Sequence, residues 1–166
     1  RAEAQPRERP APAQAPGPAH AEPSEATTLT EVLDWHVREH GERTQITVLS
    51  DAGEEELSYR KLKEGATAIA AGLQRAGLQP RQTVAIMLPT SADYFYTYFG
   101  VLLAGGIPVP IYPPARLSQI EEHVRRHARI LANAQAAILV TVAPAKAVAR
   151  LLEAHVPGLQ HIVTPA

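Results

Sequence analysis

The sequence predicts an α/β fold in which a largely parallel sheet is flanked by helices. Short apolar runs alternate with longer amphipathic stretches from residue 83 to the end of the chain. Two of these runs, 83–88 and 137–141, are almost continuously apolar, which is typical of strands buried on both faces of a parallel sheet. The intervening stretches are long enough to return over the sheet as helices. The strand–helix–strand order therefore predicts parallel pairing through right-handed crossovers.

The first predicted element is a helix. Thr28 can cap the run LTEVLDWHVREH, where apolar residues recur at spacings of three and four, and Gly41 can end it. We expect the apolar face of this helix to pack against the sheet and to bury His36 there. The predicted apolar face consists of Leu29, Val32, Leu33, His36 and Val37.

A hairpin and a second helix are expected next. Residues 45–49 and 55–59 favour paired strands because the turn sequence Asp51-Ala52-Gly53 separates them. From Ser58 to Gly77 the apolar residues recur every three or four positions, which predicts an amphipathic helix.

The second half alternates strands with helices. Further strands are expected at 83–88, 107–112, 137–141 and 161–164, and further helices at 91–104, 117–133 and 145–154. Ser91 and Asp93 can cap the helix 91–104. On this helix we expect one side to face the strands, namely Tyr94, Tyr98, Val101 and Leu102.

Residues 1–27 are expected to form a disordered Pro/Ala-rich linker. The stretch 1–23 holds six prolines and seven alanines. This stretch has few bulky apolar side chains. Burying them would release too little free energy to offset the conformational entropy that the chain loses on ordering. A ligand for a proline-recognition domain is an alternative use of such a tract. Residues 28–166 are then the folded α/β part.

Composition excludes several functional classes. The 166 residues carry a formal net charge of −1, which does not favour a nucleic-acid or anionic-membrane surface. There is no cysteine, so disulfides, thiolate catalysis and thiolate metal sites are excluded. No apolar run approaches the roughly 18 residues of a membrane span. We expect a cytoplasmic protein with no nucleic-acid partner and no membrane span.

Residues 36–40 match the H-x-x-E-H pattern of inverted zinc proteases. His36 and His40 would lie on one face of a helix, with Glu39 as the general base. The pattern fixes only three positions, so it arises often by chance, and the further carboxylate ligand has no evident source. We therefore expect no zinc site here.

A second histidine pair, His123 and His127, has the same spacing on the helix 117–133. Neighbouring arginines disfavour a metal cation, so the pair predicts a partly buried helix face instead. Oppositely charged residues four positions apart predict a balanced, solvated face on the same helix. These charged residues are Glu121, Glu122, Arg125, Arg126 and Arg129.

Gly100, Gly105 and Gly106 have a spacing similar to that of a phosphate-binding loop. The Lys-Ser/Thr pair that such a loop requires is missing, and these glycines end a helix where a phosphate loop begins one. We interpret them as a helix stop and as positions of close contact with the strands.

Four prolines surround the end of the predicted strand 107–112. Because proline lacks a backbone donor, this strand should lie at an edge of the sheet. Ligand clefts lie past the carboxyl ends of parallel strands, which is where Tyr112 and Arg116 follow. A rigid connector is the simpler interpretation, and direct ligand contact by Tyr112 or Arg116 is the alternative. The prolines are Pro108, Pro110, Pro113 and Pro114.

Residues 29–141 resemble the amino-terminal subdomain of fatty acyl-AMP ligases, a branch of the adenylate-forming, AMP-binding superfamily. The resemblance rests on LSYRKLKEGATAIAAGL, then VAIMLPTSADYFYTYFGVLLAGGIPVPIYPP, then a helix beginning ARL and the strand AILVT. The sequence YPP followed closely by Arg-Leu distinguishes this branch from acyl-CoA synthetases and amino-acid adenylation domains. By this resemblance, 28–166 is a truncated amino-terminal subdomain.

The resemblance implies a parent enzyme that activates a fatty acid with ATP and Mg²⁺ and releases pyrophosphate. It would then pass the acyl group to the phosphopantetheine thiol of an acyl-carrier protein, in lipid, polyketide or lipopeptide synthesis. Other expected partners are the fatty acid itself and the rest of the adenylating domain.

The nucleotide and lysine motifs of that family have no counterpart up to Ala166. We therefore assign no catalytic, cofactor-binding or metal-binding residue, expect no cofactor in this segment, and expect the segment to be inactive alone. Two alternatives remain open. One is a non-catalytic interaction module built from the same lobe. The other is part of an acyl-CoA synthetase or of a peptide-synthetase adenylation domain.

Overall fold

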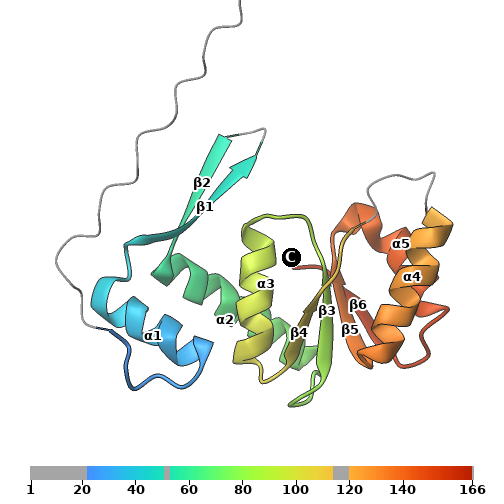
Figure 1. The fold of residues 1–166 in the computed structure, drawn as a ribbon, viewed down its shortest axis with the longest axis horizontal. Coiled ribbons are helices and arrows are strands. Elements are labelled where there is room, and N and C mark those ends of the chain that lie inside the picture. Colours follow the sequence, from blue (N-terminus) through green and yellow to red (C-terminus); the bar gives the residue numbers. More distant parts are fainter. Residues whose placement is uncertain (1–21, 51–52, 114–119, 166) are drawn as a thin grey trace, which may run out of the picture.

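The computed structural model describes residues 22–50, 53–113 and 120–165 (Figure 1). The expected α/β class is confirmed, with a parallel four-stranded sheet covered by helices and a separate two-stranded hairpin. Most of the expected linker, together with Pro114 and Arg116, lies outside the described residues. The linker therefore stays a prediction.

The elements follow the predicted order, with most boundaries within three residues of the expected ones. The helices are α1 (Leu29–His40), α2 (Tyr59–Arg75), α3 (Ala92–Leu103), α4 (Ile120–Asn133), the short 3₁₀ helix η2 (Ala143–Ala145) and α5 (Lys146–Glu153). The strands are β1 (Thr44–Ser50), β2 (Gly53–Ser58), β3 (Thr83–Met87), β4 (Ile107–Pro110), β5 (Ala136–Thr141) and β6 (His161–Val163).

The main sheet has the strand order β4-β3-β5-β6, and every neighbouring pair is parallel. Successive side chains of β3 point to opposite faces of the sheet. Val84 and Ile86 pack against α2 and α3, whereas Ala85 and Met87 belong to the core under α4 and α5. All four are 0% exposed. This burial on both faces explains why the strand is a continuous apolar run.

The prolines of β4 lie on an edge strand, as predicted. The N–H groups of Ile107 and Ile111 donate to carbonyl groups of the Gln82–Ile86 segment, both at 2.9 Å. Pro108 and Pro110 occupy the alternate positions, whose nitrogens face away from β3. Their missing donors therefore cost no hydrogen bond within the sheet.

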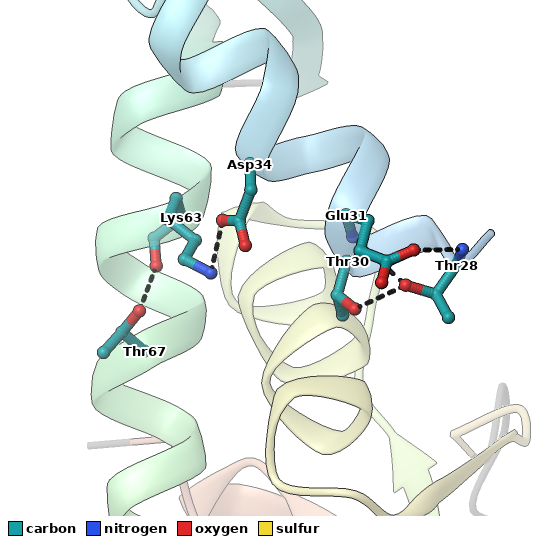
Figure 2. Close-up of polar contacts among 6 residues, drawn as sticks. All are labelled: Thr28, Thr30, Glu31, Asp34, Lys63 and Thr67. Carbon is teal, nitrogen blue, oxygen red and sulfur yellow. Dashed lines mark hydrogen bonds and ion pairs between the residues drawn. The ribbon is translucent and has the colours of Figure 1, made fainter. Parts of the chain in front are cut away.

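Helix α1 begins with a capping box (Figure 2). The Thr28 hydroxyl accepts a hydrogen bond from the Glu31 N–H at 3.2 Å, and the Glu31 carboxylate accepts one from the Thr28 N–H at 3.0 Å. One turn later, Asp34 pairs with Lys63 of α2 at 2.6 Å. The cap defines where α1 starts, and the ion pair connects it to α2.

The expected packing of α1 on the sheet is wrong. Leu33 packs with Tyr59 and Leu62 of α2, and Leu29, which was expected on the apolar face, is 55% exposed. His36 stacks on Tyr59, with ring centroids 4.3 Å apart. Helices α2 and α3 already cover this face of the sheet, so the apolar stripe of α1 is buried against them instead.

Helices α2 and α3 approach closely at Gly100. A Cβ atom there would lie 2.7 Å from the Cβ of Ile69 on α2. Gly100 therefore contacts a helix, whereas the sequence had predicted contact with a strand. Gly105, with a φ of +78°, ends the helix region as predicted.

The buried side of α3 differs in part from the expected one. Leu102 is only partly buried, and Val101, which is 0% exposed, occupies the core position.

The hairpin β1–β2 is antiparallel and separate from the main sheet (Figure 1). Val48 and Leu57 are buried against Phe95 and Tyr96 of α3. Leu49, on the opposite face of the strand, is 72% exposed.

Within the part of the chain that the structure describes, no helix has the length and apolar character needed to cross a bilayer.

Candidate functional site at the carboxyl edge of the sheet

A hollow of about 430 Å³ lies past the carboxyl ends of β3 and β4. Parallel α/β sheets form their ligand clefts at this edge. The predicted position of Tyr112 is confirmed, because it follows β4 and lines the hollow. The lining residues are Leu88, Pro89, Thr90, Tyr94, Pro110, Ile111, Tyr112 and Pro113.

The β3 wall of the hollow is built by a strand-to-helix turn. Ser91 caps α3, because its hydroxyl accepts a hydrogen bond from the Tyr94 N–H at 3.4 Å. The same hydroxyl donates to the Pro89 carbonyl at 3.2 Å. These bonds hold the turn and place Tyr94 in the first turn of the helix, beside the hollow. No pattern in the sequence indicated this wall, although Ser91 could be identified as a capping residue.

The β4 wall is anchored by Ile111 and ends at an exposed tyrosine. Ile111 is 8% exposed and belongs to the core under α4 and α5, whereas Tyr112 is 80% exposed at the rim. Pro110 and Pro113 restrict the backbone on either side of this pair. Contact of a ligand with Arg116 stays a prediction, because Arg116 is outside the described residues.

The described lining of this hollow contains no ionisable side chain except the two tyrosines. The hydroxyl groups of Thr90, Tyr94 and Tyr112 can form hydrogen bonds, and the proline and aromatic surfaces can contact an apolar ligand. Stabilisation of a transferring phosphoryl group needs cations and metal, which these walls do not supply. The hollow is therefore suited to an uncharged or apolar part of a substrate.

The strand order reverses between β3 and β5, where a doubly wound sheet usually has its crevice. Here the buried hydroxyl of Thr141 donates to the Met87 carbonyl at 3.2 Å, which links the carboxyl ends of β3 and β5. A second hollow of about 410 Å³ lies beside β5 and β6, under α2. Val140, Val163 and Arg75 are among its lining residues, and the sequence contained no signal for it.

The H-x-x-E-H residues lie away from this edge, on α1. His36 Nδ1 and His40 Nε2 are 2.6 Å apart and hydrogen-bonded to each other. Across residues 22–50, 53–113 and 120–165, no three His, Cys, Asp or Glu side chains are grouped to hold a metal ion. Burial, His40 and Arg43 lower the pKa of His36.

The partly buried histidine face on α4 is confirmed. His127 is 5% exposed, its ring stacks on that of His123 with centroids 3.8 Å apart, and its Nδ1–H donates to the His123 carbonyl at 2.9 Å. Burial, His127 and Arg126 lower the pKa of His123.

These two histidine pairs predict that acid weakens the fold. The pKa values of His36 and His123 are lower in the folded chain than in the unfolded chain, so the unfolded chain binds more protons. Their contribution to stability is complete above the unfolded pKa of about 6.5 and is lost as the pH falls below it. We expect the Tm, measured by circular dichroism, to fall between about pH 7.5 and 5.5. The double variant His36→Gln/His123→Gln should lose less over the same range, and an unchanged pH dependence would contradict the assignment.

The profile of the family described as AMP-binding enzyme matches residues 33–165. The chain belongs to this family, and its parallel sheet corresponds to the amino-terminal part of adenylate-forming enzymes.

Two curated relatives illustrate the range of the family. The chain is 28% identical over 139 residues to 2,3-dihydroxybenzoate-AMP ligase of Bacillus subtilis, covering 82% of this chain and 24% of that protein. It is 32% identical over 109 residues to phosphinothricin tripeptide synthetase PhsC of Streptomyces viridochromogenes, covering 66% of this chain and 10% of that protein. The chain thus spans no more than about a quarter of either relative.

Solved structures support the same family. The fatty acyl-adenylate ligase of L. pneumophila, in complex with acyl adenylate and pyrophosphate, matches with a TM-score of 0.70 at 27% identity, over 86% of this chain and 23% of that one. The fatty acid AMP ligase from Legionella pneumophila matches with a TM-score of 0.66 at 29% identity, over 74% and 21%. McyG A-PCP, complexed with phenylalanyl-adenylate, matches with a TM-score of 0.70 at 24% identity, over 82% and 22%, and shows the shared fold alone.

Proposed function

We propose that this chain is the amino-terminal part of a fatty acyl-AMP ligase. The observation that carries the proposal is its likeness to fatty acyl-adenylate ligases, at 27–29% identity with TM-scores of 0.66 and 0.70. The sequence YPP followed by Arg-Leu, which is similar to that branch, supports the same choice. The apolar and aromatic walls past β3 and β4 are compatible with an acyl substrate.

The proposed reaction has two steps. A fatty acid carboxylate attacks the α-phosphorus of ATP, an acyl–phosphate bond forms, the bond from that phosphorus to the bridging oxygen breaks, and pyrophosphate leaves. Mg²⁺ would neutralise charge on the phosphates. The thiolate of an acyl-carrier protein then attacks the acyl carbonyl, a thioester forms, and AMP leaves. In this scheme the described residues form the scaffold lobe, and cationic groups elsewhere in the polypeptide stabilise the phosphoryl transfer. A cytoplasmic location is part of the same proposal.

A second candidate is an adenylation domain that activates an amino acid. Its supporting observation is the 32% identity to phosphinothricin tripeptide synthetase PhsC, which exceeds the identity to either Legionella structure. The two candidates differ in the acid that is activated, so substrate choice separates them.

The test uses the protein encoded by the complete reading frame that contains this sequence. ATP–pyrophosphate exchange is measured with medium- and long-chain fatty acids, with amino acids and with dihydroxybenzoate. We expect exchange with fatty acids only, followed by acyl transfer to a holo carrier protein and not to coenzyme A. Exchange that depends on an amino acid would favour the second candidate, and formation of acyl-CoA would overturn the carrier assignment.

Residues 1–166 expressed alone should show no fatty-acid-dependent exchange. The described walls provide no cationic clamp for the phosphates, and the family's nucleotide motifs have no counterpart in this segment. Circular dichroism should first establish that the segment is folded. Exchange above that of a mock purification would contradict the scaffold role.

A further inference from the structure

A groove between α4 and α5 lies outside the candidate site. The two helices lie side by side over one face of the sheet, at the opposite end of the molecule from the hairpin (Figure 1). The groove has a volume of about 590 Å³ and is mostly apolar. Its apolar floor includes Val124, Ala128 and Leu151. Its polar lining consists of Glu121, Arg125, Arg129 and His155, so arginines outnumber the one carboxylate. Leu151 is 49% exposed, so its side chain is accessible from the groove.

The arginines beside this groove lie on the exposed, charged face of α4 that the sequence predicted. Arg125 and Arg129 also line a neighbouring hollow on α4, of about 690 Å³, together with Arg126 and Glu122. Among the described residues, no ion pair joins these arginines to Glu121 or Glu122. The ion pairs found within the described ranges are Arg60–Glu42, Lys61–Glu55 and Lys63–Asp34, all in the first half of the chain.

The charge of the molecule is divided along the sequence. Residues 120–165 carry five Lys or Arg and three Glu, so this part has a net positive charge. The ranges 22–50 and 53–113 carry seven Lys or Arg and eleven Asp or Glu, so that part has a net negative charge. The groove lies in the basic part, and a complementary partner there is acidic.

We propose that the α4–α5 groove binds an acidic amphipathic helix of the acyl-carrier domain that receives the acyl group. This inference rests on the proposed function, which requires such a carrier. An apolar groove between two helices suits the apolar stripe of a third helix. Carboxylates along the rim of that helix would pair with Arg125 and Arg129, whose guanidinium groups bind carboxylates in a bidentate manner. A second copy of the same basic face would be repelled.

The test uses the protein of the complete reading frame and its holo acyl-carrier protein as the probe. The variant Arg125→Glu/Arg129→Glu reverses the charge at the groove. The control Arg38→Glu/Arg43→Glu makes the same change of net charge at exposed positions on α1 and in the turn that follows it. A third variant, Leu151→Asp, tests the apolar floor at a half-exposed position where folding should be retained. Each protein is assayed for pyrophosphate exchange without carrier, for acyl transfer, and for binding of fluorescently labelled carrier.

We expect the groove variants to raise the KM for the carrier, and the Kd, at least about tenfold, with a larger effect at low salt. Exchange without carrier and the control variant should stay within about twofold of the unmodified protein. Unchanged transfer and binding in the groove variants would overturn the docking surface, and so would an equal loss in the control.

Other occupants of the groove give different results. A loss of exchange and a fall in Tm in the groove variants would show that another part of the polypeptide covers it, which overturns the inference. A change from dimer to monomer on size-exclusion chromatography would assign it to a second copy, which also overturns it. Failure of fatty-acid exchange in the unmodified protein would instead reject the proposed function, and the binding measurement would still test the surface.

Discussion

Leu139→Ala is expected to lower the free energy of unfolding by about 2–5 kcal/mol, the usual cost of removing a large side chain from a well-packed core. Leu139 is 0% exposed and lies on β5, between Ala85 of β3 and Ile162 of β6. Its side chain belongs to the core under α4 and α5, together with Leu131 and Leu152. Helices cover both faces of this strand. The surrounding side chains can therefore move only a little into the cavity that the substitution leaves.

The control for this prediction is Leu49→Ala on the hairpin. Leu49 is 72% exposed, so the same substitution should change stability by less than about 0.5 kcal/mol. Urea unfolding followed by circular dichroism measures both. Leu102 lies on the side of α3 that the sequence predicted to face the strands, but it is only partly buried, so Leu102→Ala should have an effect between the other two. Equal losses for Leu139 and Leu49 would contradict the assigned core.

Gly100→Ala is expected to lower the free energy of unfolding by about 1–3 kcal/mol, the usual cost of overpacking. The new Cβ would lie 2.7 Å from the Cβ of Ile69 and 2.9 Å from the backbone oxygen of Ala66. Both atoms are on α2 and cannot move without displacing that helix. The steric cost should exceed the gain in helix propensity from glycine to alanine, which is about 1 kcal/mol at most.

Gly72→Ala is the matched control on α2. The nearest atom to a Cβ at Gly72 is 4.0 Å away, so alanine fits there. This substitution should raise stability by about 0.4–1 kcal/mol because it reduces the entropy of the unfolded chain. Thermal unfolding of the two variants should therefore give shifts of opposite sign. A stabilising effect of Gly100→Ala would show that α2 and α3 are not in close contact.

Much of the fold could be predicted from the sequence because it depends on short-range patterns. The apolar runs that became β3 and β5 predicted strands buried on both faces, and Pro108 and Pro110 predicted an edge strand. Thr28 and Ser91 predicted where two helices start, because a capping side chain acts within its own turn. The position of Tyr112 past the carboxyl end of a strand followed from the same local order.

The partners of each face could not be predicted in this way. The apolar stripe of α1 was visible in the sequence, but only the tertiary structure places it on Tyr59 and Leu62 instead of on the sheet. Likewise, Gly100 predicted a close contact in the sequence, but only the structure shows that α2, and not a strand, makes it.

The candidate site shows the same division. The sequence by itself determined the family resemblance, the parallel sheet and the prolines past its edge strand. Only the tertiary structure joined Tyr94 and Tyr112 across one hollow and placed arginines of α4 beside a mostly apolar groove. The physical reason is the sequence separation over which each interaction acts. Capping, proline geometry and apolar periodicity act within a few residues of the chain, whereas packing joins residues far apart in sequence and depends on which surfaces other elements already cover.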